Sequence, residues 1–329
     1  MKKLSITCLV PFALVLSATQ AKPADPLQLV QTIPLPGVEG RIDHFAVDLD
    51  GARLFAAALG NNTVEVVDLE AGQDIASIGG FSEPQGVAFV LGSDKLFVAN
   101  GGDGTVDSFD GTTFDLLNVT PFANDADNLR YDASADQLYV GYGGGALGIL
   151  NATSEELIGD IRLAGHPESF QLEKFGPRVF VNVPTAQRIQ VVDRDQGVVV
   201  DNWQVPVRDN FPMALDEGNQ RLFVAARSPA QLLVYDTSSG DLVAQLDCVG
   251  DADDVFYDAV TGRIYVSGGA GFISVFQQHG ADQYELIANI PTAAGARTSL
   301  FVPEFNRLYL AVPHQGAQAA QIWVYEVQP

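Results

Sequence analysis

Short apolar runs alternate with polar turn residues along almost the whole chain. One unit consists of His44–Leu49, Arg53–Ala58, Thr63–Asp68 and Asp74–Ile78, with Asp, Gly, Asn or Glu in the breaks. Each run has the length and the β-branched or apolar content of a strand, and each break carries residues that accept turn dihedral angles. The pattern therefore predicts four short antiparallel strands in this unit.

An aliphatic residue followed by an aromatic residue recurs at nearly constant spacing. The seven pairs begin at Leu54, Leu96, Leu138, Val179, Leu222, Ile264 and Leu308, at intervals of 42, 42, 41, 43, 42 and 44 residues. A four-stranded unit of this length cannot bury both faces of its sheet alone, so neighbouring units must pack face to face. The sequence predicts an all-β, seven-bladed β-propeller with four antiparallel strands in each blade.

The seventh unit needs a fourth strand from elsewhere, because the chain stops soon after Ile322–Val327. Leu29–Pro34 matches in character Leu286–Pro291, the expected fourth strand of the sixth unit. We expect this N-terminal strand to complete blade 7 and close the ring, which would leave no free ladder between the two ends.

The first residues are arranged like a secretory signal peptide. Lys2 and Lys3 precede an apolar run that extends from Leu4 to Ala18, and a small-residue site follows at Ala21. We expect residues 1–21 to be cleaved, residues 22–329 to form a single propeller domain, and the protein to be periplasmic or secreted. No later stretch approaches the roughly 20 apolar residues that a spanning helix needs, so no membrane span is expected.

The chain is strongly acidic, with 41 Asp and Glu against 18 Lys and Arg and a formal net charge of −23. Nucleic-acid affinity comes mostly from Lys and Arg that neutralise phosphates, so this charge argues against a nucleic-acid partner. A small molecule, a cation or a protein is the expected partner, and we expect a monomer. The alternative is that the charge only keeps an exported protein soluble.

Alignment of the seven units places one residue of each in a column just before the innermost strand. These column residues are Asp43, Gln85, Asp127, Glu168, Phe211, Asp253 and Arg297, and His44, Asn128 and Asp254 lie one position further in. Binding residues on rigid scaffolds usually lie on the loops at one end. We predict that these ten residues form a ligand-binding ring around the mouth of the central channel.

Four of the seven column residues are carboxylates, and like charges at close range raise one another's pKa unless a cation offsets them. Arg297 can pair with Asp43 or, on its other side, with Asp253. This leaves Asp127 and Glu168 without a basic partner in the column. The alternative is that the carboxylates only cap strand ends and hold channel water.

Three functions remain open for this ring. The first is binding without chemistry. The second is a metal-dependent, lactonase-like hydrolase or lyase, in which Asp127, Glu168 and His44 would hold Ca²⁺, Mg²⁺ or Zn²⁺. In such an enzyme Asp127 or Glu168 would be the general base, and His44 or His166 its acid partner. The third is a structural interaction scaffold. No specific catalytic motif accompanies the ring, so we expect binding.

Several segments resemble known repeat signatures. Leu96–Asn100, Leu138–Gly141 and Phe180–Asn182 resemble the signature of the YVTN-type seven-bladed β-propellers, and Gly40–Phe45 and Glu83–Gly86 resemble stretches of the exported YncE-like proteins. The resemblance covers nearly the whole chain after residue 21. It implies the fold and names no reaction. Some YncE-like members are associated with single-stranded DNA, whereas the charge of this chain argues against such a partner.

Overall fold

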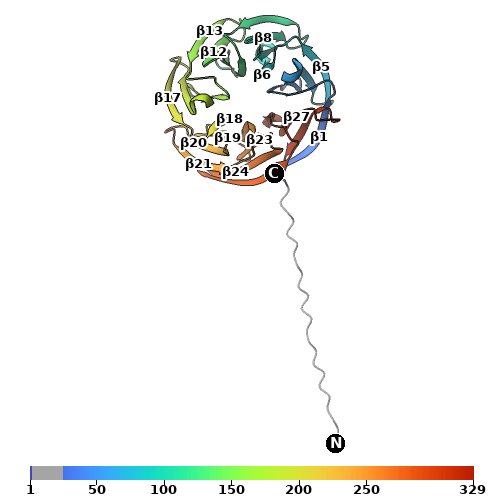
Figure 1. Cartoon of the computed structure of the whole chain (residues 1–329), viewed down its shortest axis with the longest axis vertical. Helices are drawn as coiled ribbons and strands as arrows, with labels where there is room; N and C mark the ends of the chain where they lie inside the picture. The colour runs from blue at the N-terminus through green and yellow to red at the C-terminus, as the bar shows by residue number, and fades with distance from the viewer. Residues whose placement is uncertain (2–24) are drawn as a thin grey trace.

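The computed structural model describes Met1 and residues 25–329. The expected signal peptide, with Lys2, Lys3 and the apolar run to Ala18, lies outside the described residues. Seven four-stranded antiparallel sheets surround a common axis as the blades of a propeller (Figure 1). This confirms the predicted all-β, seven-bladed architecture. Among the described residues, no helix has the length and apolar character needed to cross a membrane.

The blades follow one another in chain order. Blade 1 contains β2 (Phe45–Asp48), β3 (Arg53–Ala58), β4 (Thr63–Asp68) and β5 (Gln73–Gly79), and blade 2 contains β6 (Pro84–Val90), β7 (Lys95–Asn100), β8 (Thr105–Asp110) and β9 (Leu116–Pro121). Blade 3 contains β10 (Ala126–Asp132), β11 (Gln137–Tyr142), β12 (Ala146–Asn151) and β13 (Leu157–Arg162), and blade 4 contains β14 (Phe170–Leu172), β15 (Arg178–Val183), β16 (Arg188–Asp193) and β17 (Val198–Gln204).

The remaining three blades repeat this order. Blade 5 contains β18 (Arg208–Asp216), β19 (Arg221–Ser228), β20 (Ala230–Asp236) and β21 (Leu242–Asp247), and blade 6 contains β22 (Ala252–Asp258), β23 (Arg263–Gly268), β24 (Phe272–Gly280) and β25 (Gln283–Pro291). Blade 7 contains β26 (Ser299–Val302), β27 (Arg307–Val312), β28 (Ala320–Val327) and β1 (Leu27–Leu35). Single 3₁₀ turns occur at η1 (Leu59–Asn61), η2 (Leu91–Ser93), η3 (Pro184–Ala186) and η4 (Pro303–Phe305).

The first strand of the chain closes the ring. β1 pairs antiparallel with β28, with Ile33 opposite Ile322 and Leu35 opposite Ala320. The side chains of Ile33 and Leu35 are buried in the apolar cluster between blades 7 and 1. The predicted completion of blade 7 by the N-terminal strand is confirmed, and one sheet contains both the first strand, β1, and the last, β28.

A cluster of buried apolar side chains lies at each boundary between adjacent blades of the described ring. The repeated aliphatic and aromatic pairs supply both sides of these clusters, because successive side chains of a strand point to opposite faces. Leu54 packs in the cluster with blade 7, whereas Phe55 packs in the cluster with blade 2. The next pair, Leu96 and Phe97, is divided in the same way. The sequence period therefore reflects the packing of each blade between its two neighbours.

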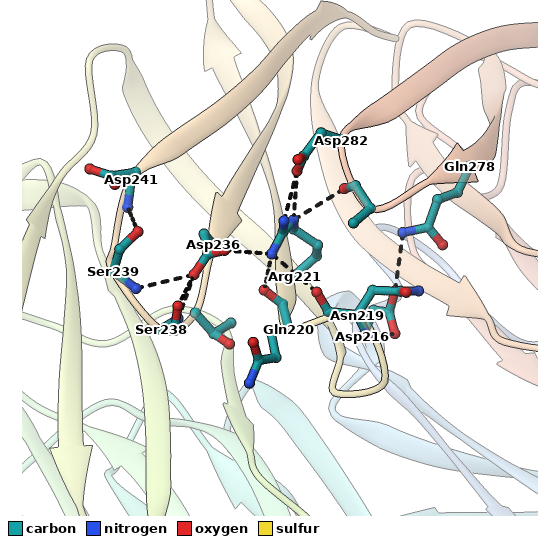
Figure 2. Close-up of polar contacts among 12 residues, drawn as sticks. Asp216, Asn219, Gln220, Arg221, Asp236, Ser238, Ser239, Asp241, Gln278 and Asp282 are labelled. Carbon is teal, nitrogen blue, oxygen red and sulfur yellow. Dashed lines mark hydrogen bonds and ion pairs between the residues drawn. The ribbon is translucent and has the colours of Figure 1, made fainter.

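In several blades a basic side chain at the start of the second strand bonds to the next blade. These residues lie on the face of the propeller opposite the column residues. In blade 5, Arg221 begins β19 and is 7% exposed. Figure 2 shows its guanidinium between Asp236 of its own blade and Asp282 of blade 6, at 2.7 Å from each. Bonds to a carbonyl of the following blade are also made by Arg53, Lys95, Arg178 and Arg263.

Candidate functional site

The column residues lie where the innermost strand of each blade is interrupted. In blades 2, 3, 5 and 6 the register between the first and second strands shifts beside the column residue, as it does between Ala126 and Leu129 around Asp127. In blades 1, 4 and 7 the first strand begins two residues after the column residue. Such irregularities release side chains from the regular pleat and re-aim them. In every blade, therefore, the column residue lies outside the regular strand pairing, at the same distance along the channel axis.

All seven column residues line one cavity of ≈ 250 Å³, which we call the mouth cavity. Of the ten predicted binding residues, nine line it, and Asp254 lies further along the channel. The predicted acid partner His166 lines the mouth cavity as well. The lining is completed by Arg41, Asp125, Ser169 and Arg227. The repeat period therefore placed the column correctly, while its role in binding stays a prediction.

Two guanidinium groups form ion pairs with Asp251 and Asp253 of blade 6. The Nε of Arg297 lies 3.2 Å from the Oδ2 of Asp253, and its Nη1 lies 3.1 Å from the Oδ2 of Asp251. Arg227, in β19, also forms an ion pair with Asp253 and stands 4.2 Å from the ring centroid of Phe211. Of the two partners predicted for Arg297, Asp253 of blade 6 forms the ion pair and Asp43 does not.

Asp43, the other partner considered for Arg297, pairs instead with a residue of its own loop. The Nη2 of Arg41 lies 2.7 Å from the Oδ2 of Asp43. Asp43 is only 2% exposed, and burial raises its pKa against the opposing charges of His44 and Arg41. Arg41, two residues before Asp43 in sequence, therefore supplies the positive charge that the column alignment had attributed to Arg297 of blade 7.

Asp127 lies between two imidazole rings. The Nε2 of His166 is 3.5 Å from its Oδ2, and the Nε2 of His44 is 4.0 Å from its Oδ1. The Nδ1 of His166 donates to the carbonyl oxygen of Gly143 at 2.7 Å, because a carbonyl can only accept. Burial lowers the pKa of His166, but the interactions with Asp127 and Gly143 outweigh it and raise that pKa to about 9. His166 is therefore a cation at neutral pH.

The environment of Glu168 differs from that of the other column carboxylates. No hydrogen bond or ion pair joins its carboxylate to another described residue. Burial and the charge of Asp127 raise its pKa to about 7, against the opposing charge of His166. A carboxyl group with this pKa gains and loses a proton near neutral pH, which is a property of general acids and bases.

Two polar side chains hold column residues in place from the neighbouring blade. The Nδ2 of Asn182 donates to the carbonyl of Phe211 at 2.9 Å, and the Oγ of Ser267 donates to the carbonyl of Arg297 at 2.7 Å. Both occupy the position in the second strand that Ala57 occupies in blade 1. Sequence reasoning missed this role, although the replacement of a small apolar residue by a polar one was visible in the repeats.

Sequence reasoning also missed Arg41, Asp125, Arg227 and Asp251. Asp125 and Asp251 each precede a column residue by two positions and have left-handed φ values of 44° and 56°. Among residues other than Gly, Asn and Asp adopt this conformation most readily, so an acidic residue at this offset was a usable signal. Arg227 gave no such signal, because it reaches the cavity from the second strand of blade 5.

Metal binding at the column remains a prediction. In the part of the chain that the structure describes, no group of three or more His, Cys, Asp or Glu side chains is arranged to hold a metal ion. The proposed ligands Asp127, Glu168 and His44 all line the mouth cavity. Catalysis by these three residues with His166 is likewise neither shown nor contradicted.

No family model matches the chain, and no curated protein matches it. Among solved structures, a chain of the mitotic checkpoint complex is 14% identical over 96% of this chain and 98% of that one, with a TM-score of 0.76. The RRP9 WD40 repeats are 12% identical over 92% of this chain and 100% of that one, with a TM-score of 0.80. Hydrazine synthase of Kuenenia stuttgartiensis is 15% identical over 85% and 93%, with a TM-score of 0.71.

At these identities the likeness shows the fold alone. The chain is a seven-bladed β-propeller with WD40-like structural neighbours. Membership of the YVTN-type or YncE-like proteins stays a prediction from the repeat signatures.

Proposed function

We propose that the mouth cavity binds a small, neutral, polyhydroxylated ligand such as a sugar and leaves it chemically unchanged. The observation behind this proposal is the pairing of the column carboxylates with guanidinium or imidazole groups, with Glu168 as the exception. The lining therefore offers many charged hydrogen-bonding groups with little net charge, and hydrogen bonds to charged groups are about twice as strong as neutral ones. A ligand with many hydroxyl groups donates to the carboxylates and accepts from the guanidinium groups without breaking a pair.

The size of the cavity and one apolar surface support the same class of ligand. At ≈ 250 Å³ the cavity is slightly smaller than the pockets of about 300–1,000 Å³ that hold most small ligands, which favours a molecule of monosaccharide size. The ring of Phe211 provides an apolar contact in an otherwise polar lining. The arrangement of residues 1–21 further supports an exported protein that meets its ligand in the periplasm or outside the cell.

Calorimetric titration with neutral monosaccharides, uronic acids and amino sugars tests this proposal. We expect neutral sugars to bind best, Asp127→Asn to lose that binding with its melting transition intact, and Arg162→Gln on the outer strand β13 to bind as the wild type does. Binding of Ca²⁺, Mg²⁺ or Zn²⁺ alone that a chelator reverses would replace the sugar site by a cation site. Failure of every neutral sugar to bind would overturn the proposal.

A hydrolase or lyase is the second candidate, and the protonation behaviour of Glu168 favours it. A base with a pKa near 7 beside the protonated imidazole of His166 is a suitable pair for general acid–base chemistry. Lactone hydrolysis adds water and releases an acid, so titration of released protons detects it directly. Turnover that disappears in Glu168→Gln would establish an enzyme, whereas a bound ligand recovered unchanged supports simple binding.

A further inference from the structure

A second cavity of ≈ 400 Å³ follows the mouth cavity along the channel, and we call it the inner cavity. His44 and Ser169 line both cavities, so the two are consecutive. The lining of the inner cavity is more apolar than that of the mouth cavity, because it consists mainly of residues of the first strands. Of its apolar residues, Leu215, Phe256 and Leu300 are partly exposed, whereas Phe45, Val87 and Leu129 are buried in the clusters between blades.

One charged group in this lining has no carboxylate within ion-pair distance among the described residues. Arg130, in β10, makes a single hydrogen bond to a described residue, from Nη1 to the carbonyl of Leu129 at 2.7 Å. No ion pair joins it to a described carboxylate. Its guanidinium stands 5.7 Å from the ring centroid of Phe170. Since a guanidinium carries five N–H donors, most of those of Arg130 have no acceptor among the described residues.

The contrast with the mouth cavity makes this unpaired group informative. There Arg41, Arg227 and Arg297 each form an ion pair with a carboxylate. Removal of Arg130 from bulk water lowers its pKa, and this effect outweighs the charges of Asp254 and Asp127, which raise that pKa. Enclosing a cation without a partner costs free energy unless a ligand supplies the opposite charge.

The remaining ionisable groups of the inner cavity do not supply that charge fully. Asp254 accepts a hydrogen bond from the backbone N–H of Ser299 at 2.7 Å, and burial raises its pKa to about 7. Burial lowers the pKa of His44, but the charges of Asp43 and Asp254 outweigh it and raise that pKa. Around neutral pH the inner cavity therefore carries a guanidinium, an imidazole that holds its proton more tightly than usual, and a carboxyl group that is only partly ionised.

We propose that the inner cavity binds a small monocarboxylate with an apolar body. The carboxylate accepts two parallel hydrogen bonds from Arg130, whose planar fork matches its geometry. The body of the ligand packs against the apolar side chains of the first strands, where burial contributes about 25 cal/mol for each Å² removed from water. This site is separate from the proposed sugar site, so either can fail while the other holds.

Calorimetric titration of the whole protein with hexanoate and benzoate, matched with 1-hexanol and benzyl alcohol, tests the charge and the apolar body separately. We expect each acid to bind at least tenfold more tightly than its alcohol. Arg130→Gln removes that difference, whereas the exposed Arg162→Gln keeps it. Leu300→Trp fills the cavity with Arg130 still present and weakens both acids at least tenfold. Circular dichroism melting verifies that each variant is folded.

Several results would overturn the proposal. They are equal affinity for acid and alcohol, acid binding that survives Arg130→Gln, or no acid binding to the wild type. Inorganic phosphate binding as tightly as hexanoate would remove the role of the apolar lining. If Arg130→Gln does not fold, the Leu300→Trp variant is the test of the proposal. Unchanged hexanoate affinity in that variant overturns the proposal. Sugar binding at the mouth cavity should persist in Arg130→Gln. Its persistence would show that the loss of hexanoate binding is a local effect of the substitution.

Discussion

The imidazole of His166 lies with its Nε2 3.5 Å from the Oδ2 of Asp127. His166 comes from the loop between β13 and β14, and Asp127 from the irregular start of β10, so this contact joins the entrance of blade 4 to the innermost strand of blade 3. It also places a protonated ring beside the unpaired carboxyl of Glu168. The pKa of Glu168 therefore depends on the charges of His166 and Asp127, and pH is the direct way to probe it.

The charge of His166 should contribute stability that depends on pH. Its pKa of about 9 in the folded protein exceeds the ordinary value of 6.5, so the contribution is fully present below pH 6.5 and is lost as the pH rises through about 9. We expect His166→Gln to lower the free energy of unfolding by roughly 1–3 kcal/mol at pH 6 and to leave it nearly unchanged at pH 10. Urea unfolding at both pH values measures this. Parallel pH profiles for wild type and variant would contradict it, and His279→Gln, at an exposed site, is the matched control.

The ionised carboxylate of Glu168 should lower stability, whereas the charge of His166 raises it. Its pKa of about 7 exceeds the ordinary 4.5, so the folded state holds the proton more tightly and stability declines as the pH rises from about 4.5 through 7. We expect Glu168→Gln to stabilise the protein by roughly 1–3 kcal/mol at pH 8 and to change little at pH 4.5. Thermal unfolding at the two pH values, with the exposed Glu70→Gln as control, tests this. A less stable variant at pH 8 would mean that the carboxylate has a favourable partner.

Gly86 holds the backbone of Asp127 at close range. A Cβ atom at Gly86 would lie 1.9 Å from the carbonyl oxygen of Asp127 and 3.1 Å from the backbone nitrogen of Leu129. We expect Gly86→Ala to destabilise the protein by about 1–3 kcal/mol and to weaken ligand binding at the mouth, because the innermost strand of blade 3 must move away. Gly92→Ala, where a Cβ meets nothing within 4 Å, is the control. Equal melting temperatures for the two variants would contradict this prediction.

Arg221 should stabilise the contact between blades 5 and 6. It bonds to Asp236 and Asp282 in the two blades (Figure 2), so Arg221→Met should lower the free energy of unfolding by roughly 2–3 kcal/mol. Arg307 occupies the same position in blade 7, but among the described residues its side chain bonds only to Asn306 and Glu326, within that blade. Arg307→Met should therefore cost less than about 1 kcal/mol. Chemical unfolding compares the two, and equal losses would show that the link between blades adds nothing.

The closing strand should contribute more stability than its length suggests. Ile33 is buried between blades 7 and 1, so Ile33→Ala should cost about 2–4 kcal/mol, whereas Val30→Ala, at a site that is 44% exposed on the same strand, should cost less than about 0.5 kcal/mol. Deletion of residues 25–36 should abolish cooperative unfolding, because it opens the ladder on β28. A deletion variant that melts cooperatively near the wild-type temperature would refute ring closure as a stabilising device.

The number of blades, their strand order and the closing strand were all predictable from the sequence. They depend on local signals: alternation with a period of two along each strand, turn residues between strands, and one aliphatic and aromatic pair in each repeat. Leu54 and Phe55 illustrate why these signals suffice, since their positions in one strand decide which neighbouring blade each side chain meets. The column at the mouth followed from the same period, because equivalent positions of a closed ring must lie at one level around the axis.

The chemistry at the axis was decided by the tertiary structure. The repeats do not show that Arg227 would join Arg297 on Asp253, or that Asp43 would pair with Arg41. They also do not show that Arg130 would form no ion pair with a described carboxylate. These outcomes depend on side chains of different lengths that meet from several blades in one enclosed space. A repeat period specifies where each backbone position lies, whereas charge pairing and desolvation are set by the non-repeating side chains that the closed ring brings together.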